Sequence, residues 1–503
     1  MLPFTRQEIW AEGGMKHVAG WADHLEFMDG TYTNAMRIAF ERVRAIDPEV
    51  RMAHSGTQEP SAYGALDWWK QLQMMDGLLS YTTHDMVELH RSFMRPERGF
   101  IAPWTWGYSR RGPFAVREVW WTAFIGARGI MGFINHTMVN CDWTLSSGAR
   151  DTYDSIHRLT DGTGLHLINN LVTDRDVAIL YSQASVRAAF IEKRREDCLA
   201  LREKWIAVMR ALGVAFDFVS YDQLMDGTFL SRPYKVLVLA DACALDDREI
   251  AAVEAFRRRG GKVIAEGVPG RLNWNCTPRK GGSPLKVDEL EPQISLAYRK
   301  AVNTPTAPSC AAEIERVQVK TEKFLASAGV ATDRRLRIEN VEDGKPYRHA
   351  TIFVKRDRAG NHFYGVLGEE TTPKRVRFNF PKKSHVYNLV NGRYLGFTDR
   401  AELPFGMGIP YAFQLMDRTV EIASCAAKGN EVLVCLSDAV DGAVQLRVYR
   451  PDGREARSYR ANVLVKGGRA RHAVPFALSD PKGGWKITVE SIFGGRREIL
   501  MQR

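Results

Sequence analysis

Apolar residues between Asp176 and Gly267 follow two alternating periodicities. Three short runs rich in Val, Ile, Leu and Phe begin at Asp176, Phe216 and Tyr234, and each is too short to be a helix of its own. Segments with apolar residues at three- and four-residue spacing separate or follow these runs. Such alternation predicts parallel strands joined by crossover helices, in an open sheet covered on both faces. We therefore expect an α/β domain in the middle of the chain.

Residues 1–170 also alternate between helical and strand patterns. A long amphipathic helix is expected over residues 21–48, ending at Asp47 because proline disfavours helical geometry in the residue before it. Strand patterns then occur at residues 49–55, 78–83, 99–108 and 130–138, the last followed by a single helical pattern over residues 151–169. The sum is four strand–helix units, half of the eight that a (β/α)8 TIM barrel needs.

The pattern changes again after Gly267. A polar stretch with Gly and Pro leads to a helical segment near residues 311–328, and short alternating strands separated by turn signals follow at residues 349–416. Seven further strand patterns fill residues 418–503. Short strands of this kind predict antiparallel β-sandwich domains, the last of them immunoglobulin-like.

Composition narrows the functional classes only slightly. The 503 residues are 45% hydrophobic and 26% charged, which is typical of a soluble globular protein, and no run is long and apolar enough to span a membrane. The net charge of +11 is spread in short clusters, such as Lys382 and Lys383, so a solvated surface is favoured over a nucleic-acid interface. The amino-terminal residues lack the pattern of a signal peptide.

Seven cysteines without a C-x-x-C pair predict reduced structural thiols and neither a metal site nor a disulfide framework. The first strand of the middle domain lacks a glycine-rich phosphate loop, so no nucleotide cofactor is expected. Cys243 follows a strand but lacks the glycines of a nucleophile elbow, which disfavours a glutaminase. We expect a protein without a cofactor.

Several segments in order resemble one family. The segments are residues 21–29, 44–56, the Asp67-Trp-Trp-Lys70 motif, and residues 76–81, 128–135 and 164–185. Together they resemble the carboxyl-terminal half of the catalytic barrel of glycoside hydrolase family 42 (GH42) β-galactosidases. In that family the barrel continues into a flavodoxin- or glutamine-amidotransferase-like trimerisation domain. The resemblance implies a half barrel over residues 1–172, a trimerisation domain over 173–300, a linker and β-rich domain over 301–417, and a sandwich over 418–503.

The sequence departs from this family at both catalytic positions. The family's acid/base glutamate follows an asparagine on the fourth barrel strand, and no such pair precedes Trp21. The family's nucleophile aligns with residues 101–104, where no carboxylate stands. We expect a truncated chain, a gene-model boundary, or a split gene whose separately encoded partner supplies the first half of the barrel.

Retaining glycosidases need two carboxyl groups about 5 Å apart, placed in a barrel after the carboxyl ends of strands. Glu59 follows the first strand pattern, and Asp85 and Glu88 follow the second. These three are the candidate catalytic residues. Each also fits a structural role, because carboxylates favour the first turn of a helix and Asp85 with Glu88 matches a capping box.

Polar and aromatic residues at the same strand ends are candidates for binding sugar. Trp104, Trp106 and Tyr108 alternate at period two and so point the same way, and tryptophan offers an apolar platform with a polar edge for a pyranose ring. The full set of predicted substrate-binding residues is His54, Tyr81, His84, Trp104, Trp106, Tyr108, His136 and Trp143. A core-packing role stays open for the aromatic residues.

The sequence therefore predicts a multidomain α/β plus β protein of the β-galactosidase-like glycoside hydrolases. Its expected partner is a carbohydrate substrate, and the resemblance implies a trimer. The alternative is a non-catalytic carbohydrate-binding or oligomer-assembly protein.

Overall fold

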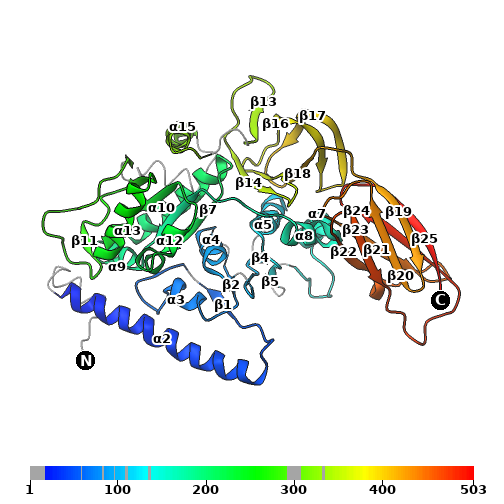
Figure 1. The fold of residues 1–503 in the computed structure, drawn as a ribbon, viewed down its shortest axis with the longest axis horizontal. Helices are drawn as coiled ribbons and strands as arrows, with labels where there is room; N and C mark the ends of the chain where they lie inside the picture. The colour runs from blue at the N-terminus through cyan, green and yellow to red at the C-terminus, as the bar shows by residue number, and fades with distance from the viewer. Residues whose placement is uncertain are drawn as a thin grey trace. The chain divides into compact units, whose positions relative to one another are not determined.

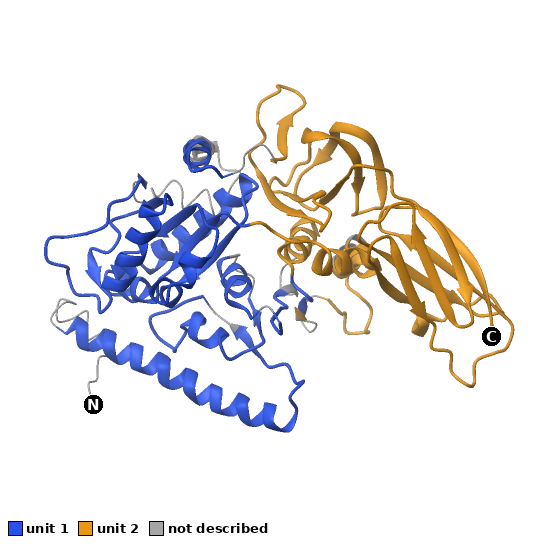
Figure 2. Cartoon of the chain, viewed as in Figure 1, with its two compact units in different colours: residues 1–105, 127–131, 175–332 blue, residues 106–126, 132–174, 333–503 orange. Residues whose placement is uncertain are grey.

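A computed structural model describes residues 17–57, 59–81, 84–95, 97–107, 112–133, 138–291, 308–330 and 335–503. The chain divides into two compact units. Unit 1 comprises residues 1–105, 127–131 and 175–332, and unit 2 comprises residues 106–126, 132–174 and 333–503 (Figure 2). Parallel-stranded sheets occupy unit 1, and antiparallel sheets make up most of unit 2.

The first described helix of unit 1 is the long α2 (Val18–Ile46), and its C-cap residue is Asp47, as the following proline predicts. Three short parallel strands follow, ordered β1-β2-β3. The elements are β1 (Ala53–Thr57), α3 (Trp68–Leu72), β2 (Gly77–Ser80), α4 (His84–Phe93), β3 (Phe100–Ile101) and β4 (Trp104–Gly107). Each predicted strand of this region has an observed counterpart, the last being β5 (Met131–Phe133), which pairs with β4.

A five-stranded parallel sheet forms the middle of unit 1 in the order β12-β10-β8-β6-β7. Counted in sequence order the strands run 2-1-3-4-5, one of the two common orders of doubly wound α/β sheets. The elements are β6 (Val177–Tyr181), α9 (Gln183–Ile191), α10 (Arg195–Ala211), β7 (Phe216–Ser220), α11 (Tyr221–Met225), α12 (Thr228–Ser231), β8 (Val236–Ala240), β9 (Ala244–Leu245), α13 (Asp247–Arg258), β10 (Lys262–Glu266), β11 (Leu272–Asn273), β12 (Glu289–Glu291) and α15 (Pro308–Ser327).

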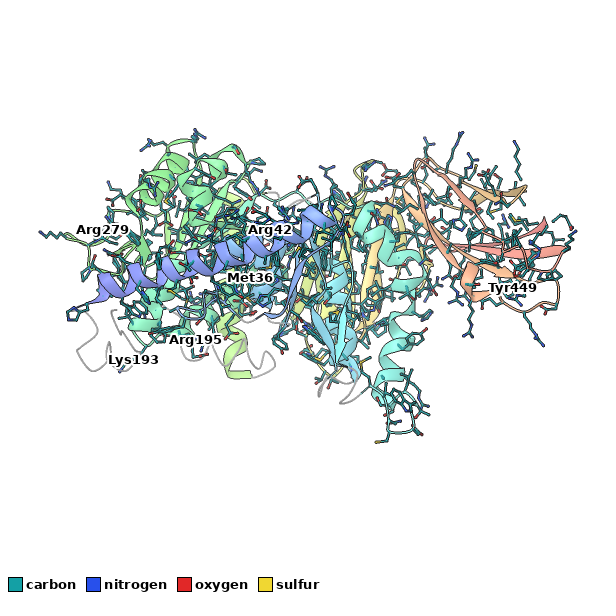
Figure 3. All side chains as sticks on the ribbon, turned by 90° about the horizontal axis from the view of Figure 1, so that it is seen from below. Met36, Arg42, Lys193, Arg195, Arg279 and Tyr449 are labelled. Carbon is teal, nitrogen blue, oxygen red and sulfur yellow. The ribbon has the colours of Figure 1, made fainter. Side chains whose placement is uncertain are left out.

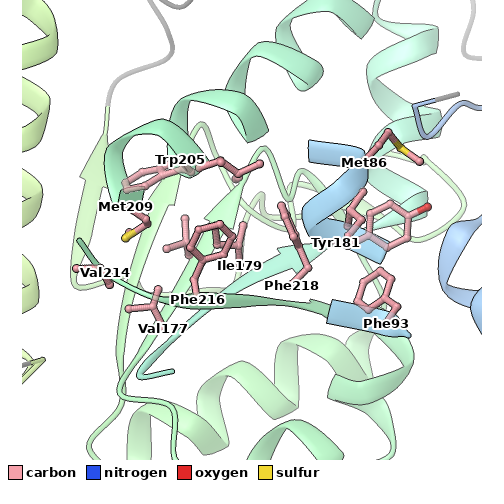
Figure 4. Close-up of a cluster of buried hydrophobic side chains, with 14 of the residues drawn as sticks. Met86, Phe93, Val177, Ile179, Tyr181, Trp205, Met209, Val214, Phe216 and Phe218 are labelled. Carbon is pink, nitrogen blue, oxygen red and sulfur yellow. The ribbon is translucent and has the colours of Figure 1, made fainter. Parts of the chain in front are cut away.

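One apolar core joins the middle sheet to the helices that follow β1 and β2. Tyr181 and Phe218 on the sheet lie in the same buried cluster as Phe93 of α4, and Trp205 of α10 is fully buried in it (Figure 4). Met36 of α2 packs against this cluster (Figure 3). All five residues of β6 and of β7 are buried, as expected for parallel strands covered on both faces.

Helices α5 (Gly112–Ile125), α7 (Ser147–Arg158) and α8 (Gly164–Asn169) belong to unit 2. The prediction of one helix over residues 151–169 is wrong, because the helix breaks at Gly162, whose φ is 113°. Asp161 accepts a hydrogen bond from Gln445 Nε2 at 2.6 Å at this break. A left-handed glycine at the junction ends the helical hydrogen-bond ladder.

The rest of unit 2 consists of antiparallel sheets (Figure 1). The first has six strands: β13 (Arg337–Asn340), β14 (Ala350–Arg356), β15 (His362–Gly368), β16 (Lys374–Asn388), β17 (Arg393–Phe405) and β18 (Tyr411–Met416). The second sheet has three strands and the third has four. These seven strands are β19 (Ile422–Lys428), β20 (Glu431–Leu436), β21 (Gly442–Tyr449), β22 (Ala461–Val465), β23 (Arg469–Ala473), β24 (Gly484–Ser491) and β25 (Arg496–Gln502). Seven strands after residue 418 agree with the sequence pattern.

Candidate functional site

The carboxyl ends of β1, β2 and β3 meet at one edge, where the family resemblance locates catalysis. Parallel pairing sets Ser55 beside Leu79 and Leu78 beside Ile101. Leu78 packs in the same cluster as Trp68 of α3, so α3 covers this face of the sheet. Alternation along the strands places Ser55 and Leu79 on the opposite face, where Ser55 is exposed and Leu79 half-buried. One face of this sheet is thus covered by helices, and the other is accessible.

A β-bulge shapes the end of β1. The register shifts between Ser55 and Thr57, and Gly56 between them has a φ of 72°. A Cβ at Gly56 would lie 3.9 Å from the Tyr81 hydroxyl, so the Tyr81 ring lies beside the bulge. The main chain of Tyr81 also forms a parallel bridge with Trp104. Tyr81 is 38% exposed and stands between the first and fourth strands, a position open to a ligand.

Glu59 follows the bulge and is paired with the first residue of α10. Arg195 Nη2 donates to Glu59 Oε1 at 2.6 Å, and 23% of the Glu59 side chain is exposed (Arg195 is labelled in Figure 3). The guanidinium fixes one carboxylate oxygen. Glu59 is the most accessible of the three candidate carboxylates.

Asp85 and Glu88 lie on α4 and are buried. The helix begins at His84, so Asp85 stands in its first turn. Arg202 Nε donates to Asp85 Oδ2 at 3.1 Å, and the Asp85 amide donates to Glu203 Oε1 at 3.0 Å. Glu88 Oε1 accepts from Arg210 Nε at 3.0 Å, and its Oε2 accepts from Arg91 Nε at 2.8 Å. Both carboxylates thus hold α4 to charged side chains, most of them on α10.

All three candidate carboxylates therefore pair with one helix of the middle domain. Arg195, Arg202 and Arg210 follow one another on α10 at intervals of seven and eight residues, which keeps them within about 80° of arc. This arginine stripe binds the loop after β1 and the helix after β2. The catalytic roles of Asp85 and Glu88 stay predictions, and their contacts already account for their burial.

The charge network continues behind Glu88. Arg91 Nη1 donates to Asp217 Oδ1 on β7 at 2.7 Å, and Arg175 Nε lies 3.0 Å from the same oxygen. Burial raises the pKa of Glu88, but Arg210 and Arg91 together hold that pKa below its usual range. The Glu88 carboxylate thus remains ionised in the fold, held in a buried network.

The predicted histidines and aromatic residues fall in different environments. The His54 ring lies 6.2 Å from the Trp68 ring, on the helix-covered face, and burial lowers its pKa. Trp104 is half-buried at the start of β4. The side chains of His84 and Trp106, together with Tyr108 and His136, lie outside the described residues. The sugar-binding roles of this group stay predictions.

Trp143 is presented to solvent by a tight hairpin. Val139 and Leu145 pair in an antiparallel bridge, and Asn140 Nδ2 donates to Thr144 Oγ1 at 2.9 Å. Trp143 lies at the tip with a φ of 64°, and its side chain is 87% exposed. An exposed indole on a hydrogen-bonded loop is suited to stacking against a sugar ring.

One titrating carboxyl group was missed by the sequence analysis. Asp67 caps α3 by accepting a hydrogen bond from the Lys70 amide, and Tyr221 donates its hydroxyl to the other oxygen. Burial raises the pKa of Asp67 to about 6. The side chain is fully buried, so this group stabilises the join between α3 and α11. Its position before Trp68-Trp69-Lys70 indicates a helix cap, but the partner on α11 is distant in sequence.

Cys243 has the properties of a structural thiol. Burial raises its pKa well above the usual value, and Arg194 Nη2 lies 3.7 Å from the sulfur. A protonated, buried thiol is a poor nucleophile. Among the described residues no cluster of three or more His, Cys, Asp or Glu side chains could hold a metal ion, and no helix there is long and apolar enough to cross a membrane.

No protein-family model matches this sequence, and no curated protein matches it either. Solved structures do. An apo exo-carrageenase GH42 from Bacteroides ovatus superposes with a TM-score of 0.54 at 11% identity, over 79% of this chain and 56% of the other. A catalytic mutant of a GH42 β-galactosidase from G. stearothermophilus gives 0.56 at 11% identity, over 78% and 68%. A β-galactosidase from Bacillus circulans sp. alkalophilus gives 0.55 at 11% identity, over 78% and 68%.

The protein therefore has a distant GH42-like fold, as the resemblance implies. The chain spans little more than half of the carrageenase and about two thirds of the β-galactosidases. At 11% identity the likeness concerns the fold alone.

Proposed function

We propose that this chain supplies the carboxyl-terminal half of a TIM-barrel glycoside hydrolase of the β-galactosidase type. The observation that carries the proposal is the parallel β1-β2-β3 sheet, which α3 covers on one face only and whose strands end together beside Tyr81. The superpositions on GH42 β-galactosidases support it. In this proposal the middle sheet is a flavodoxin-like domain and residues 418–503 form an immunoglobulin-like sandwich.

The remaining strand–helix units would cover two surfaces of unit 1. Strand β1 pairs only with β2 among the described residues, and unpaired strand edges favour addition of another strand. Helix α2, just before β1, exposes five large apolar side chains: Phe27, Met28, Ile38, Val43 and Ile46. Four further units, on this polypeptide or on a separately encoded one, would close the barrel and bury both surfaces.

The proposed chemistry uses two carboxylates that flank a glycosidic bond. Glu59 is the candidate from this chain, because it follows a barrel strand and keeps part of its carboxylate accessible. Arg195 Nη2 fixes one oxygen of that carboxylate by a hydrogen bond. The acid that protonates the leaving oxygen would come from the other half of the barrel. The substrate would be an oligo- or polysaccharide of plant or microbial origin.

The middle domain would carry the assembly. The resemblance implies a trimer, and the doubly wound sheet is the segment that corresponds to the trimerisation domain of the family. Light scattering on the purified chain tests this point. A mass near three times 56.8 kDa supports a trimer, and a monomer mass contradicts it.

A second candidate function is binding of carbohydrate without hydrolysis. Two observations favour it: the buried ion pairs of Asp85 and Glu88, which leave Glu59 as the accessible carboxylate, and the exposed indole of Trp143. In this alternative, Trp143 and Tyr81 contact the glycan and no bond is cleaved.

Binding and hydrolysis of β-galactosides distinguish the two functions. Isothermal titration with galactotetraose should give an affinity that Trp143→Ala lowers about tenfold, the effect of one lost aromatic stack. The matched control is Leu478→Ala, an equally exposed apolar side chain remote in sequence. Hydrolysis is measured as release of 4-nitrophenol from 4-nitrophenyl β-galactoside. Release by the wild type that is abolished in Glu59→Gln supports the hydrolase. Binding without release by the completed barrel supports the binder, and absence of both overturns the proposal.

A further inference from the structure

Strands β16 and β17 form an antiparallel ribbon in unit 2 (Figure 1). Residues 374–405 contain seven Lys or Arg and two Asp or Glu, so this ribbon holds five of the chain's eleven excess positive charges. Strand β17 pairs only with β16 among the described strands. The ribbon therefore combines a free edge with concentrated charge.

Aromatic rings lie among these charges. His385 pairs across the ribbon with Phe397, and their ring centroids are 4.8 Å apart. The His385 ring is also nearly parallel to the Tyr394 ring, with centroids 5.9 Å apart, and His385 Nδ1 and the Tyr394 hydroxyl are hydrogen-bonded at 2.7 Å. Phe397 is 52% exposed and Tyr394 is 42% exposed. The three rings, here called the ring strip, form a partly apolar surface with polar edges.

The ring strip is anchored to the interior of unit 2. Tyr394 contacts Tyr387 with centroids 5.0 Å apart, and Tyr387 is 3% exposed. The Tyr387 hydroxyl accepts a hydrogen bond from the Val420 amide at 2.8 Å, and its ring packs edge-on against Phe493. The exposed rings are therefore held in place before any ligand arrives, which lowers the entropic cost of binding.

The lysine and arginine side chains of the ribbon differ in whether they form an ion pair. Lys382 pairs with Asp417 at 2.8 Å and Arg377 with Glu402 at 2.8 Å. Lys383 and Arg393, by contrast, make no ion pair within the described parts of the chain. Lys383 Nζ lies 5.0 Å from the centre of the Phe397 ring. These side chains leave positive charge available to an anionic ligand.

We propose that the ring strip and Lys383 beside it bind an anionic polysaccharide, a glycan bearing sulfate or carboxylate groups. Pyranose faces would stack on Phe397 and Tyr394, and Lys383 would contact an anionic substituent. The choice of a glycan over single-stranded nucleic acid, which also suits aromatic and basic surfaces, rests on the proposed carbohydrate function.

Affinity electrophoresis of the full chain tests this site. Native gels contain a sulfated galactan, the same galactan after desulfation, or neither. We expect the sulfated polymer to retard the protein most strongly. Phe397→Ala should weaken that retardation about tenfold in apparent affinity through loss of stacking, and Lys383→Gln about threefold through loss of one exposed charge contact.

Two control variants remove equivalent features elsewhere in unit 2. Arg454→Gln deletes a cation whose side chain is 86% exposed, and Leu478→Ala deletes an exposed apolar group. These controls are needed because a net charge of +11 attracts any polyanion. Equal losses of apparent affinity for Lys383→Gln and Arg454→Gln would show that the retardation comes from general charge attraction, and would overturn the proposal.

The remaining outcomes are also decisive. Equal retardation by the desulfated galactan would overturn the role of Lys383. Competition by a single-stranded oligonucleotide at lower concentration than by the sulfated galactan would assign the surface to nucleic acid instead. Because the measurement is binding at the ribbon, it stands or fails independently of hydrolysis at Glu59.

Discussion

Glu88, one of the predicted catalytic residues, forms a buried charge network. Its two oxygens accept hydrogen bonds from Arg210 and Arg91, and its side chain is fully buried. The sequence indicates the right residue type at the end of a strand. The sequence pattern does not reveal that Arg210 is the partner of Glu88, because Arg210 lies on α10, a helix of the middle domain.

Replacement of Glu88 should therefore destabilise unit 1. Glu88→Gln leaves Arg210 and Arg91 buried with a missing counter-charge, which costs about 3–5 kcal/mol of unfolding free energy. Urea denaturation measures the change. Glu41→Gln is the matched control, because its pair with Arg37 is exposed and contributes about 0–1 kcal/mol. Similar effects of the two substitutions would contradict the buried network.

Asp67 should make stability depend on pH in the opposite sense to most carboxylates. Burial raises its pKa in the folded state to about 6, above its ordinary value of 3.8, so the folded state binds more protons between these values. Stability from this group is therefore present at low pH and is lost as pH rises from about 4 to 6, by about 3 kcal/mol at most.

Thermal denaturation of wild type and Asp67→Asn between pH 4 and pH 7 measures this pH-dependent contribution to stability. Relative to the variant, the wild type should lose stability as pH rises, because the asparagine cannot ionise. A constant difference between the two proteins across this range would show that Asp67 does not titrate there.

Among the helices and strands, those with a repeating apolar pattern can be predicted from the sequence, and local irregularities of the backbone cannot. The strands of the middle sheet are buried on both faces, and their apolar runs reveal them. Strand β17 was not predicted, because its residues are mostly exposed or half-buried and carry no apolar alternation. The bulge at Gly56 and the break at Gly162 depend on positive φ angles, which many glycines do not adopt. A glycine in the sequence therefore does not by itself predict either feature.

The break at Gly162 yields a test in paired glycine variants. Gly162→Ala places a side chain at a φ of 113°, which costs about 1–3 kcal/mol. Gly30→Ala, inside α2 with no atom within 4 Å of the new Cβ, should gain up to about 1 kcal/mol from helix propensity. Chemical denaturation compares the two. A neutral Gly162→Ala would contradict the observed backbone there.

For the whole molecule, the order of segments was predictable and the grouping of segments was not. Helices α5, α7 and α8 group with the carboxyl-terminal sheets in unit 2, although they follow the barrel strands in sequence. Phe124 of α5 shows the reason, since its ring lies 5.7 Å from Phe353 and 6.0 Å from Phe363. Such aromatic contacts between residues more than 200 apart leave no periodic signal in the sequence.

Completing the half barrel distinguishes a partial glycoside hydrolase from a chain that functions by itself. The coding DNA around this sequence and its neighbouring reading frames should encode four strand–helix units with an Asn-Glu pair. Co-expressed with the chain, that segment should copurify with it and release 4-nitrophenol from the β-galactoside, whereas the chain alone should not. Full activity of the chain alone, or a neighbouring segment that neither binds nor activates it, would contradict the proposal that this chain is half of a barrel.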